Sequence, residues 1–491
     1  MLGPRGWRAP EDAPGYLEDP RGRFSGRARL IAMPEDTTGV AALLRHCSET
    51  GTPVIPYGGG TGVVAGQLSI DSEAVVILSL ERMDRLRGFS LEDGAMTVEA
   101  GATLAEAHEM AAAQGMTFPL SMGSKGSCTI GGNLATNAGG IQVLRDGNAR
   151  DLCLGIEAVF ADGSVLGELT PLRKNNIGYD LRHLLIGSEG TLGVITAATL
   201  AIRPMDAETV TAFCGIEGPH QAVALLRALR GDFGTAISAF ELMSEFGVGL
   251  ATRTLDTLRR PLTGQHPWYI LVELGGAKGL RTSFENSLEC QFQQGRVRDA
   301  AIAETIAQRQ GIWALRELTP EVNRRNGAFC SSDTSVPISR IDEFIARTHE
   351  ALAAIHPGLR VNSYGHVGDG NIHHNVFPPQ GTDKQDFLFV HPGINDAVRM
   401  AITRISHELG GSISAEHGIG RLKTEDLGQF AGATRLDMMR RIKAALDPGG
   451  IMNPGALLPT APRDSAAGSD AAAPDMPWKG KWTGDHSQSD R

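Results

Sequence analysis

The sequence predicts an α+β protein of two or three domains. Its 491 residues are too many for one hydrophobic core. The N-terminal half carries three loops rich in Gly, Ser, Thr and Asn, joined by short strands. After Arg203-Pro204, strands and helices alternate without such a loop, which indicates a second domain of α+β type.

Composition excludes several classes of partner. Hydrophobic residues make up 41% and charged residues 21%, as in soluble globular proteins. The net charge of −10 and the pI near 5.8 argue against nucleic acid and anionic membrane surfaces, which both require a basic patch. No apolar run reaches the roughly eighteen residues that span a bilayer. We therefore expect no nucleic-acid partner and no transmembrane segment.

The cysteines and the N-terminus indicate the compartment. The six cysteines form no CxxC pair, which argues against an iron–sulfur cluster and gives no disulfide framework. The first twenty residues lack the apolar stretch of a secretory signal. These features predict a cytoplasmic protein, either free or peripheral to the inner membrane.

Residues 30–56 are predicted to form a strand, a helix and a strand. Residues 30–34 are short and apolar. Thr37-Thr38 is a candidate N-cap for a helix that places Val40, Leu43, Leu44 and Cys47 on one face. Gly51-Thr52-Pro53 ends this helix before the apolar residues 54–56.

The Gly-rich loops indicate an extended ligand. Residues 57–66 contain five glycines, which let main-chain N–H groups gather around an anion, although a flexible turn has the same composition. No Lys-Ser/Thr pair follows, so this is not a P-loop. Residues 119–140 and 178–196 form the other two loops, with a strand at 154–160, a turn at 161–163 and a return strand between them. Together they predict one long ligand held by main-chain groups.

The C-terminal half carries its own candidate groups. Residues 221–230 and 342–355 are amphipathic helices, and residues 268–274 form a strand. Arg316 lies in the segment 312–317, and the planar fork of an arginine suits bidentate binding of a carboxylate. An ordinary surface arginine on a helix is the alternative.

Residues 363–375 hold three histidines among glycines and an aspartate. Residues 371–376 are predicted to form a strand, so His373 and Asn375 share one face and His374 takes the other. His366 precedes the turn and His373 follows it, while residues 414–420 add Glu416 and His417. The pattern predicts a metal site of two histidines and one carboxylate, against the alternative of polar residues in a Gly-rich loop.

The N-terminal loops resemble a known flavoprotein family. Residues 57–66, 127–140 and 187–193 are similar, in order and spacing, to the FAD segments of flavoproteins related to vanillyl-alcohol oxidase and p-cresol methylhydroxylase. The resemblance implies a two-subdomain FAD-binding domain. Because Tyr57 stands where covalent members carry a histidine, it implies noncovalent FAD. The implied FAD-binding residues are Tyr57, Gly58, Gly59, Gly60, Thr61, Gly62, Gly123, Ser124, Ser127, Thr129, Asn133, Asn137, Glu189, Gly190, Ile195 and Asn453.

The C-terminal motifs resemble D-2-hydroxyacid dehydrogenases of the D-2-hydroxyglutarate and D-lactate type. The matching segments are Trp-Ala-Leu-Arg-Glu at 313–317, Gly-His-x-Gly-Asp-Gly-Asn-x-His-x-Asn at 365–375, Ser-Ala-Glu-His-Gly at 414–418 and the segment 447–455. By this resemblance, Arg316 and Asn375 hold the substrate and His417 is the base. His366, His373 and Glu416 bind a divalent metal, usually zinc. The electron acceptor is expected to be a quinone, an electron-transfer flavoprotein or another subunit, and the protein a homodimer.

The resemblance also sets the expected domain boundaries. Residues 1–25 are an N-terminal extension, 26–205 the FAD-binding domain, and 206–425 an α+β cap domain with an antiparallel sheet. Residues 426–459 form a helical segment that returns to the FAD domain. The polar residues 460–491 form a disordered tail.

Two departures bear on the substrate. Aligned on residues 333–337, Ser331 stands where D-2-hydroxyglutarate dehydrogenases carry a substrate-binding lysine. Downstream of Arg316, Thr319 and Pro320 stand near the position of an expected threonine. Arg324 or Arg325 is a candidate replacement for the lysine charge, and the glutarate specificity stays open.

Two other functions fit parts of the pattern. Two histidines and a carboxylate also form the facial triad of non-heme iron oxygenases, although the three flavin-type loops argue against that class. The chain could also be a noncatalytic FAD-bearing subunit of a larger complex that resembles glycolate oxidase. Such a subunit would not need the metal cluster, the arginine and the base together.

Overall fold

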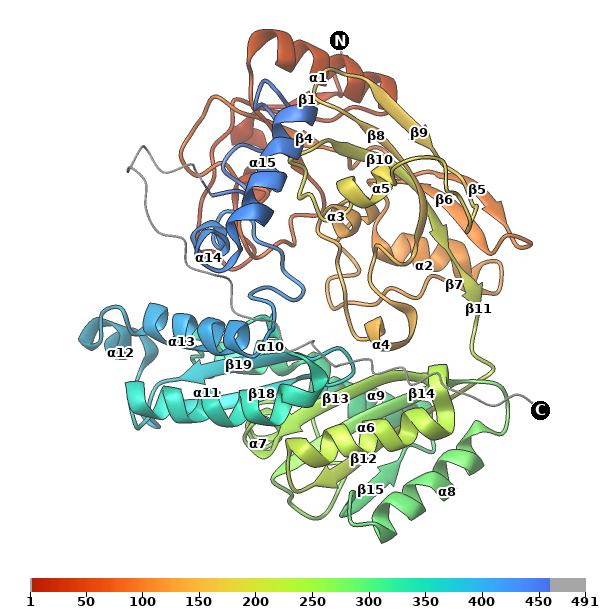
Figure 1. Cartoon of the computed structure of the whole chain (residues 1–491), viewed down its shortest axis with the longest axis vertical. Helices are drawn as coiled ribbons and strands as arrows, with labels where there is room; N and C mark the ends of the chain where they lie inside the picture. Colours follow the sequence, from red (N-terminus) through yellow and green to blue (C-terminus); the bar gives the residue numbers. More distant parts are fainter. Residues whose placement is uncertain (1, 460–491) are drawn as a thin grey trace, which may run out of the picture.

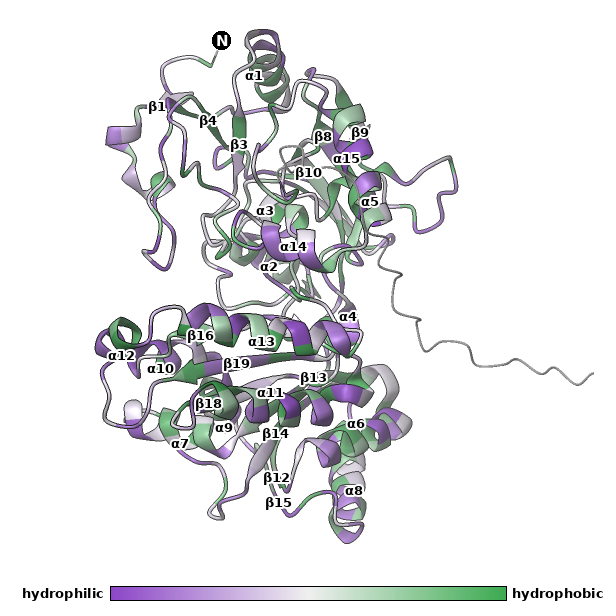
Figure 2. Cartoon of the chain, turned by 60° about the vertical axis from the view of Figure 1, so that its left-hand side comes forward, coloured by the Kyte–Doolittle hydropathy of each residue, from purple (hydrophilic) through white to green (hydrophobic). Residues whose placement is uncertain are grey.

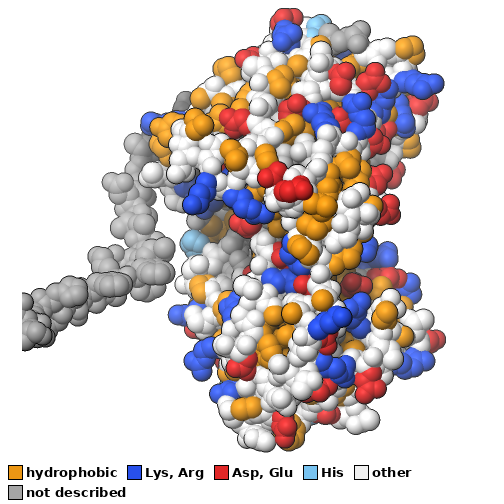
Figure 3. All heavy atoms as spheres, turned by 90° about the vertical axis from the view of Figure 1, so that its right-hand side faces the viewer, with side chains coloured by type: hydrophobic (Ala, Val, Ile, Leu, Met, Phe, Trp, Pro, Cys, Tyr) orange, Lys and Arg blue, Asp and Glu red, His pale blue; other side chains and the backbone are white. Residues whose placement is uncertain are grey.

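The computed structural model describes residues 2–459, and the predicted tail at 460–491 lies outside them. The chain forms two bodies (Figure 1). One contains the N-terminal residues up to strand β11 (Arg203–Pro204) together with the last helices, and the other contains the residues between. In the space-filling view the bodies meet at a hollowed waist (Figure 3). Helices and antiparallel sheets occur in both, which confirms the predicted α+β class.

The first sheet contains the predicted strand–helix–strand unit. Its order is β1-β2-β4-β3, with β2, β4 and β3 parallel. Its elements are β1 (Trp7–Arg8), β2 (Leu30–Ala32), α1 (Thr37–Thr50), β3 (Val54–Tyr57) and β4 (Val76–Ser79). The predicted cap at Thr37-Thr38 was wrong by one residue. Asp36 is the N-cap, and its carboxylate accepts the N–H of Gly39 at 2.7 Å.

The second sheet is antiparallel, with the order β5-β6-β10-β8-β9. Its strands are β5 (Leu86–Ser90), β6 (Ala95–Glu99), β8 (Cys153–Val159), β9 (Val165–Glu168) and β10 (Val194–Ala201). The short helices that accompany it are α2 (Leu104–Ala112), α3 (Ile130–Ala135), α4 (Val143–Asp146) and α5 (Leu181–Leu185). Helix α3 replaces part of the predicted second loop, because Thr129 caps it by accepting the N–H of Gly132.

The second body is built on an eight-stranded antiparallel sheet with the path β15-β12-β14-β13-β18-β19-β16, and β17 also pairs with β19. These strands are β12 (Glu208–Ile216), β13 (Ile237–Ser244), β14 (Trp268–Gly276), β15 (Asp299–Ile302), β16 (Cys330–Ser331), β17 (Thr334–Ser335), β18 (Arg360–His366) and β19 (Asn371–Phe377). Strands β18 and β19 form the histidine-bearing hairpin, and Tyr364 pairs with His373 across it.

Helices cover both faces of this sheet. One face packs against α6 (Pro219–Phe233), α8 (Leu280–Gln293), α11 (Ile341–Ile355) and α13 (Ile394–Glu408). The other packs against α7 (Glu245–Thr254), α9 (Ile306–Glu317) and α10 (Thr319–Arg325). Side chains that alternate along β12 pack into both helix layers: Ala212 and Cys214 point to the first face of the sheet and Phe213 points to the second. Helices α11 and α13 show polar and apolar stripes (Figure 2).

The chain then returns to the first body through α14 (Thr424–Phe430) and α15 (Ala433–Leu446) (Figure 1). Ile451 and Met452 join the core beside β3 and β4. The buried Asp447 holds this segment by accepting the N–H groups of Ile451 at 3.1 Å and Met452 at 2.9 Å, and it also pairs with Lys443. Within residues 2–459, no helix is long and apolar enough to cross a membrane.

Replacing the carboxylate of Asp447 tests this attachment. Asp447→Ala leaves two buried N–H groups without their acceptor and the Lys443 ammonium without its counterion, so we expect the free energy of unfolding to fall by about 2–4 kcal/mol. The control is Asp437→Ala on α15, the helix that Asp447 follows, where a half-exposed carboxylate pairs with the exposed Arg441; we expect a change of about 0.5 kcal/mol or less. Urea unfolding followed by circular dichroism measures both, and equal losses would contradict this role.

Candidate active site

A cavity lies between the Gly-rich loops of the first body. Most of the predicted FAD-binding residues line it: Tyr57, Gly58, Gly59, Gly60, Thr61, Gly62, Thr129, Asn133, Glu189, Gly190, Ile195 and Asn453. Ser127 lines an adjoining cavity under the N-terminal extension, together with Tyr16 and Tyr57. Gly123, Ser124 and Asn137 line neither of these two cavities. The side chain of Asn137 instead accepts the N–H of Arg150 at 3.0 Å.

Close packing of the loops explains the glycines. A Cβ on Gly59 would lie 1.7 Å from the carbonyl oxygen of Ser127, and one on Gly58 would lie 2.8 Å from the Thr129 hydroxyl. Side chains at these positions would therefore push the first two loops apart. The result is a cradle lined largely by main-chain groups, which fits an extended ligand that carries a pyrophosphate.

The cavity also receives a residue from the cap side of the chain. His417 belongs to its lining. Its loop is attached to the first body by Glu189, whose carboxylate accepts the N–H groups of Ile419 and Gly420, each at 2.7 Å. Burial raises the pKa of Glu189. Glu189 therefore joins the third Gly-rich loop directly to the segment that carries Glu416 and His417.

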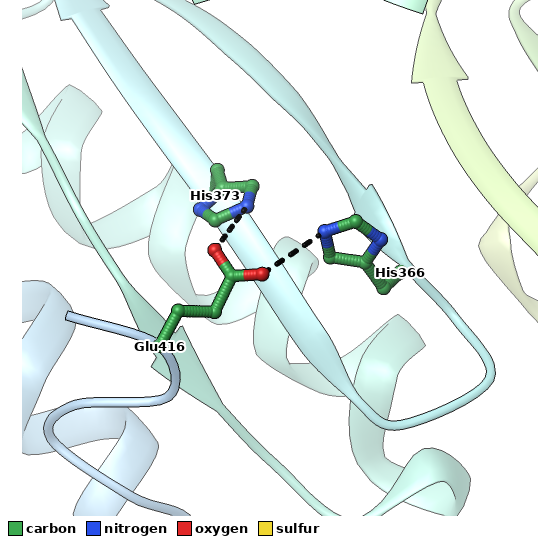
Figure 4. Close-up of side chains that lie close together, drawn as sticks. All are labelled: His366, His373 and Glu416. Atoms are coloured by element: carbon green, nitrogen blue, oxygen red, sulfur yellow. Dashed lines mark ion pairs between the residues drawn. The ribbon is translucent and has the colours of Figure 1, made fainter. Parts of the chain in front are cut away.

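His366, His373 and Glu416 converge beside this cavity (Figure 4). The Nε2 atom of His366 lies 3.4 Å from Glu416 Oε1, and that of His373 lies 3.9 Å from Glu416 Oε2. One donor atom from each residue lies within 4.8 Å of the other two. Two imidazoles and one carboxylate with this convergence fit a divalent metal such as zinc.

Outer contacts orient both imidazoles. Glu241 on β13 lies 2.6 Å from His366 Nδ1, and the carbonyl of Ser332 lies 3.2 Å from His373 Nδ1. Each contact leaves Nε2 directed at Glu416, the arrangement that metal-binding histidines use. Burial lowers the pKa of His373 to about 4. Burial also acts to lower the pKa of His366, but Glu241 outweighs it and raises that pKa to about 10.

Arg316 on α9 points to the same place. Its Nε donates to Glu241 Oε2 at 2.6 Å, and its Nη2 lies 3.2 Å from His366 Nε2. The guanidinium lies 4.9 Å from the ring centroid of Tyr364. The Tyr364 hydroxyl in turn accepts from Asn375 Nδ2 at 3.3 Å. The two residues predicted to hold the substrate, Arg316 and Asn375, thus flank the predicted metal cluster.

Asp333 fixes the loop that carries the predicted third ligand, Glu416, and the predicted base, His417. Its buried carboxylate accepts the N–H of Glu416 at 3.2 Å and that of His417 at 2.9 Å. It also lies 3.3 Å from His417 Nδ1 and 3.6 Å from Lys423 Nζ. Burial would raise the pKa of Asp333, but His417 and Lys423 hold it well below its usual range. This contact turns Nδ1 of His417 toward Asp333.

Sequence reasoning missed Glu241, Asp333 and Tyr364. A glutamate within the apolar run 237–243 was a usable signal, because a charge is buried only where it is paired. Asp333 opens the segment 333–337, which resembles the family pattern without indicating a role for its carboxylate. His374 faces the opposite side of the sheet, where its Nδ1 lies 2.8 Å from the Ser363 hydroxyl, so it takes no part in the cluster.

The residues that depart from the family pattern, and the two arginines considered as replacements, make their contacts away from the histidine cluster. Ser331 is exposed on β16, opposite Asn375 on β19. The Thr319 hydroxyl, at the start of α10, donates to the Leu315 carbonyl of α9 at 2.9 Å. Arg325 pairs with Glu321 on α10, and Arg324 is exposed. None of these residues adds a described contact to the metal cluster.

Sequence comparison gives the family. Residues 28–167 match the FAD binding domain family, and residues 205–457 match the family of FAD linked oxidases, C-terminal domain. The chain is 37% identical over 438 residues to the mitochondrial D-2-hydroxyglutarate dehydrogenase of Rattus norvegicus, covering 88% of this chain and 79% of the relative. It is 34% identical over 467 residues to D-2-hydroxyglutarate dehydrogenase of Xanthomonas citri pv. viticola, covering 94% of this chain and 96% of the relative.

Structural comparison gives the fold. The crystal structure of p-cresol methylhydroxylase with substrate bound matches with a TM-score of 0.69 and 15% identity, covering 92% of this chain and 94% of that one. The predicted resemblance and the predicted FAD are confirmed by these matches. The fold is therefore that of p-cresol methylhydroxylase, and the chain belongs to the FAD-linked oxidases, in the family of the D-2-hydroxyglutarate dehydrogenases.

Proposed function

We propose that the protein is a metal-assisted, FAD-dependent dehydrogenase that oxidises a D-2-hydroxyacid to the 2-oxoacid. The two relatives described above are named D-2-hydroxyglutarate dehydrogenases, which supports this substrate class. One observation carries the proposal. The adjacent residues Glu416 and His417 face two sites at once, the histidine cluster and the flavin-type cavity.

Arg316 has the chemistry to orient the substrate. Its Nε is bound to Glu241, so the guanidinium is fixed with its remaining N–H groups toward the cluster. A fixed planar fork binds a carboxylate in one orientation, and this decides which C2 hydrogen faces the flavin. Asn375 and Tyr364 lie beside it as further polar partners for the acid.

His417 has the position of a general base. Its Nδ1 is turned to Asp333, so Nε2 is the nitrogen that can take the hydroxyl proton of the substrate. A divalent cation held by His366, His373 and Glu416 would supply Lewis acidity that makes this proton easier to remove. Bound FAD would supply the acceptor for the C2 hydrogen as hydride.

The two rival functions receive less support. A non-heme iron oxygenase needs no FAD-binding domain, whereas residues 28–167 match one. A noncatalytic FAD-bearing subunit would not need Arg316, the histidine cluster and His417 around one point. Whether the protein acts as a dehydrogenase or as an FAD-bearing subunit, we propose that its electrons pass to a quinone, an electron-transfer flavoprotein or a separate subunit.

Anaerobic reduction of the flavin tests the reaction directly. We expect D-2-hydroxyglutarate, D-lactate or D-malate to bleach the oxidised flavin of the purified protein, because reduction of the flavin by the bound acid needs no external electron acceptor. The absorbance near the flavin maximum is followed after mixing, with the L-enantiomers as controls. Absence of bleaching by all of these acids and by glycolate would contradict the proposed reaction.

The role of the metal is tested by substitution of one ligand. His373→Ala removes a ligand, so we expect bound divalent metal, measured by plasma mass spectrometry, to fall at least tenfold, and flavin reduction to slow about 100-fold or more. His407→Ala, on the exposed side of α13, is the matched control and should change neither. Unchanged metal content in His373→Ala would exclude this cluster as the metal site.

The role of Arg316 is tested by a change that keeps its charge. Arg316→Lys loses the planar fork that binds Glu241 and a carboxylate together. We expect kcat/KM for the 2-hydroxyacid to fall about tenfold to 100-fold with flavin content unchanged. Arg324→Lys on the neighbouring helix is the control and should keep wild-type values. A fully active Arg316→Lys variant would show that bidentate binding is not required.

A further inference from the structure

The N-terminal extension is packed against the first sheet. It precedes residue 28, where the matched FAD binding domain family begins. Strand β1 pairs antiparallel with β2, and Ala13, which is 6% exposed, packs in one apolar cluster with Ile31 of β2 and Ile77 of β4. The extension therefore has a fixed position on the sheet whose strand β3 leads into the first Gly-rich loop, residues 57–66.

Tyr16 of the extension holds Tyr57, the first residue of this loop. The two ring centroids lie 4.6 Å apart, and the Tyr57 hydroxyl donates to the Gly15 carbonyl at 3.2 Å. The Tyr16 hydroxyl donates to Glu81. Burial, followed by this bond, raises the pKa of Tyr16 to about 12, so its hydroxyl keeps the proton that it donates. Both side chains are partly buried, and each is fixed at its ring and at its hydroxyl.

The position of Tyr57 decides the shape of the loop. Gly60 has φ of 70°, in the left-handed region that favours glycine. A Cβ at Gly60 would lie 2.1 Å from the Tyr57 hydroxyl oxygen. The Tyr57 side chain therefore lies directly against the turn at Gly60, and no larger residue fits between them. A shift of Tyr57 would remove the surface against which this turn packs.

The extension also contacts the loop near its other end. Arg23 Nη2 donates to the carbonyl of Val63 at 2.7 Å. The carboxylate of Asp19, which is 3% exposed, accepts both the main-chain N–H and the Nε–H of Arg23, each at 3.2 Å. These bonds fix the main chain and the side chain of Arg23 together. The first Gly-rich loop is thus held by the extension at Tyr57 and again at Val63.

Between these two contacts the loop presents its main chain to the flavin-type cavity. Gly58, Gly59 and Gly60 line this cavity. Fixing the backbone of one residue costs about 1–2 kcal/mol, and glycine loses the most conformational freedom. Where the folded protein already holds the loop in one shape, this cost does not fall on cofactor binding, and the cofactor binds more tightly. The contacts made by Tyr16 and Arg23 therefore affect cofactor affinity.

We propose that the N-terminal extension retains the cofactor: Tyr16 and Arg23 hold residues 57–63 in the shape that binds the pyrophosphate of FAD, and so slow its release. Both are positioning residues, because they act through the loop. Covalent members of the family carry a histidine at the position of Tyr57, whereas in this chain Tyr57 joins the loop to the extension. The inference concerns the cofactor and goes beyond the proposed reaction, since it holds for any substrate.

Release of FAD from the full-length holoenzyme tests this role. Tyr16→Ala removes the ring beside Tyr57, so we expect the dissociation constant of FAD to rise about tenfold or more, with faster release. Arg23→Gln loses the bond to Val63 and should raise the constant about threefold or more, whereas Tyr16→Phe keeps the ring and should stay within about threefold. Trp7→Ala, the control, removes a half-exposed ring from the same extension and should change the constant less than about twofold. Flavin fluorescence after dilution measures release, and calorimetry of the flavin-depleted protein measures affinity.

Two further measurements separate positioning from general stabilisation. Urea unfolding gives the free energy of unfolding of each variant. Amide hydrogen exchange gives the mobility of residues 58–63 in the flavin-depleted protein, with strands β12 and β14 of the second body as an internal reference. If Tyr16→Ala does not fold, Arg23→Gln decides between the outcomes.

The outcomes also separate this role from the proposed reaction. A raised dissociation constant with faster exchange at residues 58–63, and unchanged exchange in β12 and β14, supports the role of the extension. A lower free energy of unfolding with wild-type affinity and wild-type loop exchange overturns it, as does wild-type flavin that stays attached after acid precipitation. Flavin that no 2-hydroxyacid reduces overturns the proposed reaction and leaves the role of the extension standing where FAD release responds as expected.

Discussion

The arrangement of the site depends on one loop that is hydrogen-bonded to both bodies. Asp333 in the cap accepts the N–H groups of Glu416 and His417, and Glu189 in the first body accepts those of Ile419 and Gly420. Asp333 is buried and Glu189 is partly buried, and hydrogen bonds to a carboxylate are strong in such surroundings. Residues 416–420 are therefore held at the boundary, with Glu416 toward the histidine hairpin and His417 toward the flavin-type cavity.

Charge balance explains why the cap tolerates so many buried ionisable groups. Burial would raise the pKa of Glu241, but His366 and Arg316 lower it to about 2, so it stays a carboxylate. The same carboxylate holds Arg316 and one Nδ1 atom in place. A single buried glutamate thus orients both the proposed carboxylate-binding arginine and one proposed metal ligand. A divalent cation at the cluster would likewise be balanced by the carboxylates of Glu416 and Glu241.

Much of the fold could be predicted from local pattern, and the site only in part. Periodicity predicted α1, α6 and α11, and composition predicted the three loops, because these signals lie within short windows. Composition predicts a loop where helix α3 forms, because the residues of this helix are rich in glycine and asparagine. Glu241 lies 125 positions from His366 and Asp333 lies 83 from Glu416, so sequence spacing carries no sign of either contact.

The central claim is that Glu416 belongs to a metal site with the two histidines, while Asp333 serves to hold its loop. A second arrangement of ligand atoms, Asp333 with Glu416 and His417, is the alternative in the same structure. Diffraction from crystals of the zinc-loaded holoenzyme, recorded on both sides of the zinc absorption edge, separates them. The account predicts one anomalous peak bounded by His366, His373 and Glu416. A peak between Asp333 and His417, or no peak beside His366 and His373, would contradict it.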